Sequence, residues 1–310
     1  MPVTLSMPHG RFGNHSAGGR GKGRGAYSVG CMPLAIDVAG LRKQYGDKAA
    51  LDGLDLQVSS GEVFALLGPN GAGKSTTVEI LEGFRERTAG DVAVLGDDPA
   101  SPTRAWRERI GIMLQSTSDQ LALTPREAIT HMGRLYPNPR ATDELLAAVG
   151  LDDKADAKPR TLSGGMRRRL DVALAVVGNP ELVFLDEPTT GFDPEARRQF
   201  WTLIEGLKEG GTTILLTTHY LDEAEYLADR IAIITQGRVA ALDTPAGLRS
   251  KATDAVVTWT HDGEQRRAVT ATPTATLREL LAATEGEVPD LTVTKPSLED
   301  VYLQIIGGDK

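Results

Sequence analysis

The sequence predicts an α/β protein with a largely parallel, buried β-sheet, followed by a small α+β appendage. Three observations lead to this fold class. Residues 63–67 and 182–185 are short continuous apolar runs, which are typical of strands covered on both faces. Between residue 33 and about residue 247, such runs alternate with helix-like segments. From about Ala252 the pattern changes to a Thr-rich alternation, one helix-like run and a final capped segment.

The individual elements follow from these runs and from helix-capping residues. Two more short apolar runs predict strands over residues 213–216 and 231–234. Thr124-Pro125-Arg126-Glu127 forms a capping box with proline at the first helical position, so a helix begins there. Asp193-Pro194 begins another helix, which ends at Gly210-Gly211. In the appendage, Ser297-Leu298-Glu299-Asp300 predicts the start of a last helix.

We divide the chain into a tail (1–31), an α/β domain (32–250) and a small accessory domain (251–310). The tail holds eight glycines, four Lys or Arg residues and no acid, without apolar periodicity, so we expect it to be disordered. A true start at Met32 is an alternative interpretation, and an arm that binds nucleic acid or lipid headgroups is a less favoured one. The tail lacks the apolar stretch of about 7 to 15 residues that a secretory signal needs.

Composition restricts the possible functions. The 310 residues are 40% apolar and 25% charged, which is ordinary for a globular protein. A net charge of −8 gives no general attraction to nucleic acid, so we expect no nucleic-acid partner. Cys31 is the only cysteine, which excludes an intrachain disulfide and fits a reducing cytosol. No window approaches the roughly 18 to 20 apolar residues of a membrane span, so we expect any action at a membrane to need a partner.

The strongest motif is Gly68-Pro69-Asn70-Gly71-Ala72-Gly73-Lys74-Ser75, which fits the GxxxxGK[ST] pattern. It follows the strand at 63–67 and precedes a helix-like run that extends to Phe84. In this context the glycines let backbone N–H groups surround phosphates, Lys74 neutralises the outer phosphates, and Ser75 can ligate Mg²⁺. Thr76 is assigned to the same nucleotide site. The motif predicts a nucleoside triphosphate without choosing between ATP and GTP; a glycine-rich turn with a chance lysine is the alternative.

Two acidic residues, Asp186 and Glu187, stand at the end of the strand that begins at Leu182. Asp186 is expected at the carboxyl end of this strand, beside the phosphate loop, where a carboxylate can hold Mg²⁺ through water. Glu187 can then act as general base on the attacking water. Such a pair alone is often a solvated strand end, but together with the phosphate loop it predicts a hydrolase centre.

A second anion receptor follows from Leu162-Ser163-Gly164-Gly165-Met166. Ser163 can cap a helix whose first backbone N–H groups and positive dipole end are left bare by Gly164 and Gly165. One chain therefore carries two predicted phosphate-binding sites.

These motifs together resemble the ABC-type ATPases over nearly all of residues 33–247. The LSGGM stretch is similar to the signature motif of that family. The order of the remaining elements also agrees: Tyr45, the phosphate loop, Gln115, the signature, the acidic strand, Gly191-Phe192-Asp193 and His219. The resemblance implies a P-loop NTPase of the ABC ATPase type, with a RecA-like core, a helical subdomain and an antiparallel β part. It implies that ATP and Mg²⁺ are the cofactors.

Roles for single residues come from the same resemblance. It implies that Tyr45 stacks on adenine, that Gln115 contacts Mg²⁺ and the attacking water, and that His219 contacts the γ-phosphate. It also implies a head-to-tail homodimer, in which Ser163, Gly164 and Gly165 of one copy close over the nucleotide of the other.

Two positions depart from the family pattern. Met166 replaces the usual Gln and Phe192 the usual Leu, and we expect these changes to alter packing without abolishing activity. The run Arg167-Arg168-Arg169 is expected on a solvated or intersubunit face behind the signature.

The stretch LSGGMRRRL and the ending KPSLEDVY are similar to the daunorubicin-resistance branch of drug and lipid exporters. That resemblance implies the ATP-hydrolysing motor subunit of a multidrug, antibiotic or lipid exporter. It would be peripheral on the cytoplasmic face of a bacterial membrane and act with a separate transmembrane permease. We expect residues 121–136 to be the transmission surface, because they link Gln115 to an exposed, well-capped helix; an ordinary surface helix is the alternative. An importer motor is the alternative. An ABC ATPase of translation or DNA repair is less favoured, because neither a second phosphate loop nor a sustained heptad run is present.

Overall fold

The computed structural model describes residues 33–113, 123–251, 255–284 and 286–307. The predicted tail and Gln115 lie outside the described residues. Within the described ranges, no helix has the length and apolar character needed to cross a bilayer.

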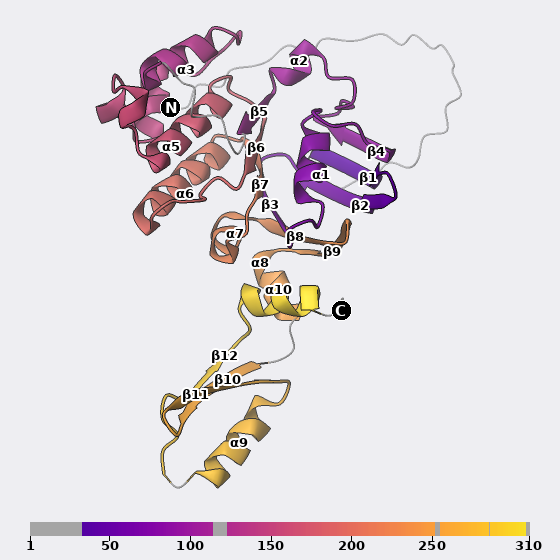
Figure 1. Cartoon of the computed structure of the whole chain (residues 1–310), viewed down its shortest axis with the longest axis vertical. Coiled ribbons are helices and arrows are strands. Elements are labelled where there is room, and N and C mark those ends of the chain that lie inside the picture. Colours follow the sequence, from indigo (N-terminus) through magenta and orange to yellow (C-terminus); the bar gives the residue numbers. More distant parts are fainter. Residues whose placement is uncertain (1–32, 114–122, 252–254, 285, 308–310) are drawn as a thin grey trace, which may run out of the picture. The chain divides into compact units, whose positions relative to one another are not determined.

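A six-stranded sheet forms the centre of the α/β domain, with the strand order β5-β6-β7-β3-β8-β9 (Figure 1). All neighbours pair in parallel except β9, which runs antiparallel to β8. The strands are β3 (Val63–Leu67), β5 (Ile110–Met113), β6 (Leu182–Asp186), β7 (Thr213–Thr217), β8 (Arg230–Thr235) and β9 (Arg238–Asp243). The four strands predicted from apolar runs are confirmed as β3, β6, β7 and β8.

The sheet is buried on both faces, which explains the continuous apolar runs. Successive side chains of a strand point to opposite faces. Val63, Ala65 and Leu67 of β3 accordingly pack into one hydrophobic core, whereas Phe64 and Leu66 pack into a second. Each face therefore carries its own apolar layer.

Helices cover the first face: α3 (Pro125–Gly133), α4 (Thr142–Ala148), α5 (Gly164–Val176) and α6 (Pro194–Glu209), with α7 (Leu221–Leu227) near its edge (Figure 1). Two single 3₁₀ turns, Asp152–Lys154 and Pro159–Thr161, connect α4 to α5. The predicted capping box is confirmed, because Thr124 N donates to Glu127 Oε2 (2.9 Å) and Glu127 N to Thr124 Oγ1 (3.3 Å). Asp193 caps α6 by accepting from the N–H of Ala196 at 2.8 Å.

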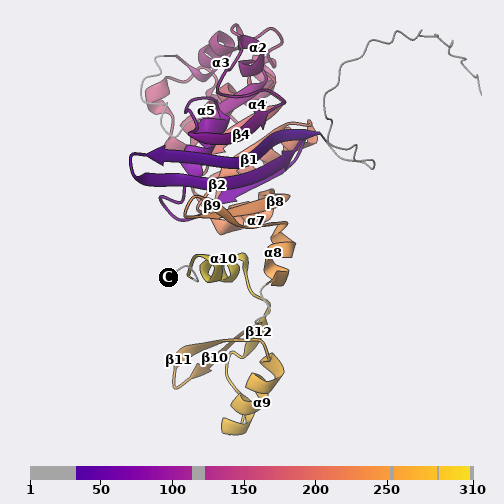
Figure 2. The same cartoon turned by 90° about the vertical axis from the view of Figure 1, so that its right-hand side faces the viewer.

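The second face packs against α1 (Lys74–Leu81) and a separate antiparallel sheet of order β2-β1-β4. These strands are β1 (Leu34–Tyr45), β2 (Lys48–Ser59) and β4 (Ala89–Val94), and the long β1-β2 hairpin is seen in Figure 2. The short helix α2 (Arg104–Arg107) buries Trp106 against this layer. The helix-like run predicted to extend to Phe84 ends at Leu81 in the structure, because Glu82 caps the helix and Gly83 takes a positive φ.

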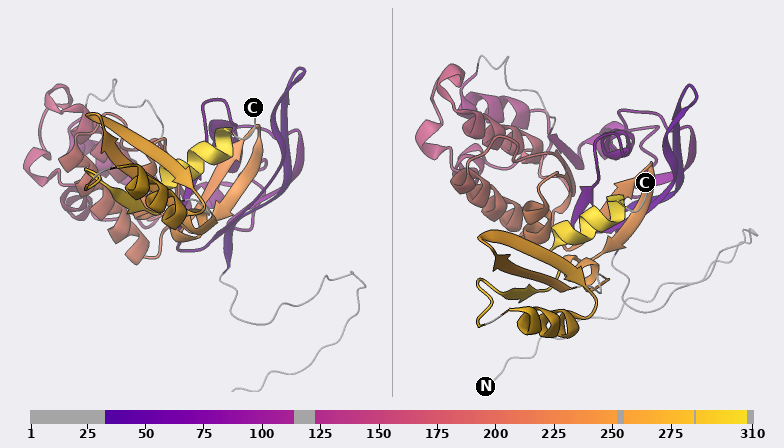
Figure 3. Two further views of the ribbon diagram at one scale, coloured as in Figure 1. Left: turned by 90° about the horizontal axis from the view of Figure 1, so that it is seen from below. Right: turned by 60° about the horizontal axis from the view of Figure 1, so that its bottom comes forward.

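The C-terminal residues form the expected α+β segment. A third sheet, of order β11-β10-β12, consists of β10 (Ala255–His261), β11 (Glu264–Thr270) and β12 (Thr292–Thr294), and α9 (Pro273–Ala283) packs on β10 (Figure 3). The helix α10 (Leu298–Gly307) instead packs against α7 and α8 (Pro245–Lys251), where Leu298 and Val301 join the first hydrophobic core. The division at residues 250/251 stays a prediction.

Candidate functional site

A cavity of about 370 Å³ opens beside the β3–α1 loop and the end of β6. It is lined by residues from three separate parts of the chain: Tyr45, Lys48, Ala50, Asn70, Gly71, Gly73, Lys74, Ser75, Thr76, Asp186 and Glu187. The phosphate-loop residues and the two acids, about a hundred residues apart in sequence, therefore face one space. This cavity is called the nucleotide cavity below.

The β3–α1 loop has a conformation that only glycine fits at two points. A Cβ on Gly68 would lie 2.3 Å from the carbonyl oxygen of Ile234. At Gly73, with φ +109°, a Cβ would lie 2.8 Å from the carbonyl oxygen of Ala50. These close approaches hold the loop against β2 and β8 at the mouth of α1.

Lys74 is buried at the floor of this loop. Its Nζ donates to the carbonyl oxygens of Gly68 (2.7 Å) and Pro69 (3.2 Å). Burial lowers the pKa of Lys74, and the negative charges of Glu187 and Asp186 partly offset this effect. The buried Lys74 and the exposed Ser75 therefore both line the cavity.

The two acids are positioned by the adjacent strand β7. The hydroxyl of Thr217 donates to Oδ1 of Asp186. The backbone N–H of Glu187 donates to both the carbonyl and the hydroxyl oxygen of Thr217, each at 3.1 Å. His219 lies two residues beyond β7, with its Nδ1 3.6 Å from Oε1 of Glu187. The predicted base and the predicted γ-phosphate contact are therefore neighbours.

The donor set fits Mg²⁺ bound together with a nucleotide. The hydroxyl of Ser75 and the carboxylate of Asp186 are oxygen ligands on one cavity, which is the ligand chemistry that Mg²⁺ prefers. The described residues hold no cluster of three or more His, Cys, Asp or Glu side chains that could bind a metal.

Tyr45 stands at the rim of the nucleotide cavity with 42% of its surface exposed. Lys43 Nζ lies 5.1 Å and Arg85 Cζ 5.4 Å from the centre of its ring. An exposed ring with cations beside it is suited to stacking on a base that carries phosphates.

The second predicted anion receptor lies outside this cavity. Ser163 caps α5, where its Oγ accepts from the N–H of Met166 at 3.2 Å. Ser163 and Gly164 are exposed, and neither they nor Gly165 line the nucleotide cavity. A Cβ on Gly164 would meet nothing within 4 Å, so packing within the chain does not require glycine there.

The arginine run 167–169 behind this receptor is half-buried and not fully solvated, whereas an intersubunit face there stays a prediction. Arg168 is partly buried and donates to backbone carbonyls at the end of β6. Met166 packs on the first hydrophobic core, and Phe192 is buried in it with its ring edge-on to Phe200 at 6.0 Å, so both unusual residues do serve packing.

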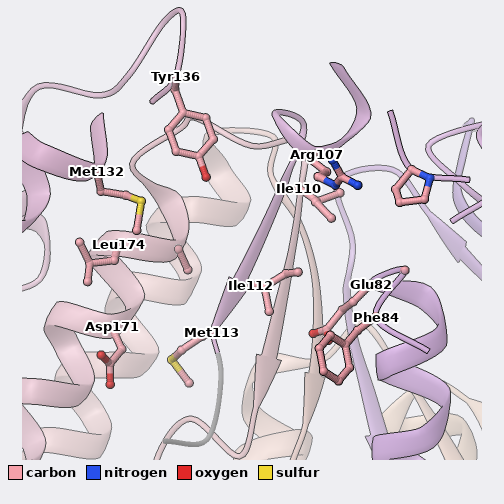
Figure 4. A pocket seen from close by; sticks show the side chains of 13 residues that line it. Glu82, Phe84, Arg107, Ile110, Ile112, Met113, Met132, Tyr136, Asp171 and Leu174 are labelled. Atoms are coloured by element: carbon pink, nitrogen blue, oxygen red, sulfur yellow. The ribbon is translucent and has the colours of Figure 1, made fainter. Parts of the chain in front are cut away.

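A second cavity, of about 590 Å³, lies between the end of α1, β5 and the helices α3 and α5 (Figure 4). It is mainly apolar: Ile110, Ile112 and Met113 come from β5, Met132 and Tyr136 from the predicted transmission segment, and Leu174 from α5. Glu82 also faces this cavity, where burial, followed by the negative charges of Asp186 and Glu79, raises its pKa to about 8.

Of the site residues predicted from the sequence, the structure brings together Tyr45, the phosphate loop, Asp186, Glu187 and His219. It places Ser163, Gly164 and Gly165 elsewhere, and Gln115 lies outside the described residues. Sequence reasoning missed Thr217 and Lys48, which are ordinary residues of a strand end and a hairpin and stand in no motif.

Comparisons with known proteins agree with this geometry. A family profile described as ABC transporter matches residues 51–190. The daunorubicin/doxorubicin resistance ATP-binding protein DrrA of Streptomyces peucetius is 42% identical, over 88% of this chain and 92% of its own length. The Nod factor export ATP-binding protein I of Rhizobium sp. (strain N33) is 43% identical, over 69% of this chain and 72% of its own. The dimeric structure of MJ0796, a bacterial ABC transporter cassette, superposes with a TM-score of 0.60 at 25% identity, covering 67% of this chain and 98% of that one.

Proposed function

The chain belongs to the ABC transporter ATP-binding family and is an ATPase, and from this premise we propose that it is the motor subunit of an exporter with a separate membrane protein. The observation that carries the proposal is the pairing of a cavity lined by the phosphate loop and two acids with an exposed second anion receptor on the same chain. The site is proposed to bind ATP with Mg²⁺, held by Ser75, Gln115 and Asp186, and the nucleotide contacts run from Gly68 to Thr76.

The chemistry follows from the acids and the lysine. Lys74 neutralises the outer phosphates and Tyr45 stacks on the adenine. Glu187 accepts the proton of the attacking water as the water oxygen bonds to the γ-phosphorus. The bond between the γ-phosphorus and the β–γ bridging oxygen breaks, which gives ADP and inorganic phosphate. His219, beside Glu187, contacts the γ-phosphate oxygens and orients the carboxylate. When bound, Mg²⁺ would neutralise part of the negative charge of the phosphates.

The exposed receptor at Ser163 is proposed to bind the nucleotide of a second copy. The receptor does not line the chain's own nucleotide cavity, and the space around Gly164 is open. Both observations support the proposal, because a phosphate from another copy could approach the backbone N–H groups at the start of α5. In a head-to-tail homodimer, each ATP would lie between two anion receptors and hold the copies together until hydrolysis.

The similarity to the daunorubicin/doxorubicin resistance protein DrrA, which extends over most of this chain, supports a role in export. The membrane protein is proposed to dock at the apolar cavity between α1, β5 and α3. Met132 and Tyr136 of the transmission segment line that cavity. The first two residues of the segment, 121 and 122, lie outside the described ranges. The proposed location is the cytoplasmic face of a bacterial membrane.

Substitution at Glu187 tests the composite site. Glu187→Gln removes the base but keeps the shape of the side chain, so ATP should bind while turnover slows by about 10²-fold or more. With ATP and Mg²⁺ the variant should elute as a stable dimer in size-exclusion chromatography. Adding Ser163→Arg fills the second receptor and should return the protein to the monomer. Hydrolysis at the original rate in Glu187→Gln contradicts the base, and a dimer in the double variant contradicts the role of Ser163.

The membrane partner is tested by co-expression with a transmembrane permease whose gene adjoins that of the chain. We expect the two to co-purify from detergent. Inside-out vesicles should then accumulate a fluorescent anthracycline on addition of ATP, and a Lys74→Ala motor should prevent this. ATP-driven release from the vesicles instead would favour an importer.

A further inference from the structure

The backbone of Glu187 is in an unusual conformation. Its φ is +45°, in the left-handed region that residues other than glycine rarely adopt. Such a conformation persists only where the surroundings hold it, and it is often found at functional sites. The groups that hold Glu187 therefore bear directly on where its carboxylate points.

Glu187 directly follows β6, and both of its backbone polar groups bond to other elements. On one side, its N–H donates to Thr217 of β7. On the other side, its carbonyl oxygen accepts from Nη2 of Arg168 at 3.0 Å and, at the longer distance of 3.4 Å, from the backbone N–H of Thr190. The left-handed turn is thus fixed between a neighbouring strand and the helix α5.

Arg168 holds more than this one carbonyl. The same Nη2 donates to the carbonyl oxygen of Asp186 at 3.2 Å, and Nε donates to that of Pro188 at 3.3 Å. One guanidinium edge therefore bonds three consecutive carbonyls, through the turn that contains the base. A planar guanidinium offers several donors in fixed directions, whereas a lysine ammonium is a single point of attachment.

We propose that Arg168 is a positioning residue for ATP hydrolysis, which fixes the left-handed turn at Glu187 and so aims its carboxylate at the attacking water. The inference rests on the proposed role of Glu187 as base. Without Arg168 the turn relaxes toward an ordinary backbone conformation, and the carboxylate moves away from His219 and the cavity.

The position of Arg168 on α5 adds a consequence. Ser163 caps the start of this helix, and Arg168 lies in its second turn. The helix that presents Ser163 to a partner's nucleotide therefore also fixes the base of its own chain. Displacement of α5 when a dimer closes would be transmitted to Glu187 through these three hydrogen bonds.

Steady-state kinetics of Arg168→Met and Arg168→Lys test the proposal. We expect kcat to fall by about tenfold to a hundredfold in Arg168→Met, with KM for ATP within about threefold, because the base is displaced while the phosphate loop is intact. Arg168→Lys keeps the charge and should still lose at least about fivefold in kcat, because the three N–H donors of an ammonium radiate from one nitrogen and cannot reproduce bonds made from both Nε and Nη2. The matched control is Arg278→Met, which removes an equal charge from an exposed position of α9 and should keep kcat within about twofold.

A double-variant measurement separates positioning from a general loss of structure. In a Glu187→Gln background, adding Arg168→Met should change the residual rate by less than about twofold, since the group that Arg168 positions is already absent. A further large loss there, or wild-type kcat in Arg168→Met or Arg168→Lys, overturns the inference. Wild-type activity in Glu187→Gln alone overturns the proposed base instead, so the two failures are distinguishable.

Discussion

Lys74 is the cation of the phosphate loop, and we propose that nucleotide binding depends on it. It is buried, and its ammonium is held by loop carbonyls beside Asp186 and Glu187. We predict that Lys74→Ala abolishes ATP binding or turnover, because no other side chain of the loop carries positive charge. Fluorescent ATP-analogue titration and phosphate release measure the two effects.

Lys48 provides the control for this prediction. It lines the same cavity but is exposed and belongs to the β1-β2 hairpin. Lys48→Ala removes a charge at the rim and should weaken binding far less than Lys74→Ala. Normal ATPase activity in Lys74→Ala would exclude the phosphate-loop assignment.

Glu82 gives a prediction on pH. Its pKa is raised from 4.5 to about 8, first by burial and then by Asp186 and Glu79. Between these values the folded chain keeps a proton that the unfolded chain releases, so the contribution of Glu82 to stability falls as pH rises toward 8. Glu82→Gln is neutral throughout. We therefore predict that its Tm matches the wild type near about pH 5 and exceeds it near about pH 8.5.

Thermal unfolding at the two pH values checks this prediction. Glu144→Gln, at an exposed position of α4, is the control and should show no pH-dependent difference. A Tm difference between Glu82→Gln and the wild type that is equal at both pH values would show that the carboxyl does not titrate as described.

At the scale of elements, α10 returns from the C-terminal sheet to the core of the α/β domain. Leu298 is 1% exposed against α7 and α8, whereas Leu303 on the same helix is 53% exposed. Leu298→Ala should lower the free energy of unfolding by about 2 to 4 kcal/mol, through lost burial and a residual cavity. Leu303→Ala should stay within about 0.5 kcal/mol of the wild type. Denaturant unfolding of the two variants measures both values, and equal stabilities would contradict the packing of α10.

At the scale of the whole molecule, this packing changes how the C-terminal segment should be removed. Truncation from residue 252 onward also deletes α10 and uncovers Leu248, so it is expected to destabilise the domain. Replacing residues 255–294 with a Gly-Ser linker of about a dozen residues keeps α10 in place.

We predict that the linker variant binds ATP with wild-type affinity, because every residue of the nucleotide cavity lies before residue 188. Assembly of the dimer or of the complex with the membrane protein should weaken. Isothermal titration with ATP and co-purification measure the two properties. A folded linker variant that no longer binds ATP would show that the proposed division of the chain is wrong.

Local features of the sequence determined much of this protein. The strands β3, β6, β7 and β8 were predictable because a strand buried on both faces must be apolar at every position. The helices α3 and α6 were predictable because their caps bond residues three positions apart. The phosphate loop was recognisable because its contacts are made by consecutive residues.

Contacts between segments distant in sequence were decided only by the tertiary structure. The hydrogen bonds of Arg168 to the turn at Glu187 depend on how α5 packs beside the end of β6, and those of Thr217 on the register of β7. The location of Ser163 outside its own nucleotide cavity, and the return of Leu298 to the core, likewise arise from packing. No residue pattern encodes these pairs, because arginine, threonine, serine and leucine are each common in many environments, and only the folded chain selects their partners.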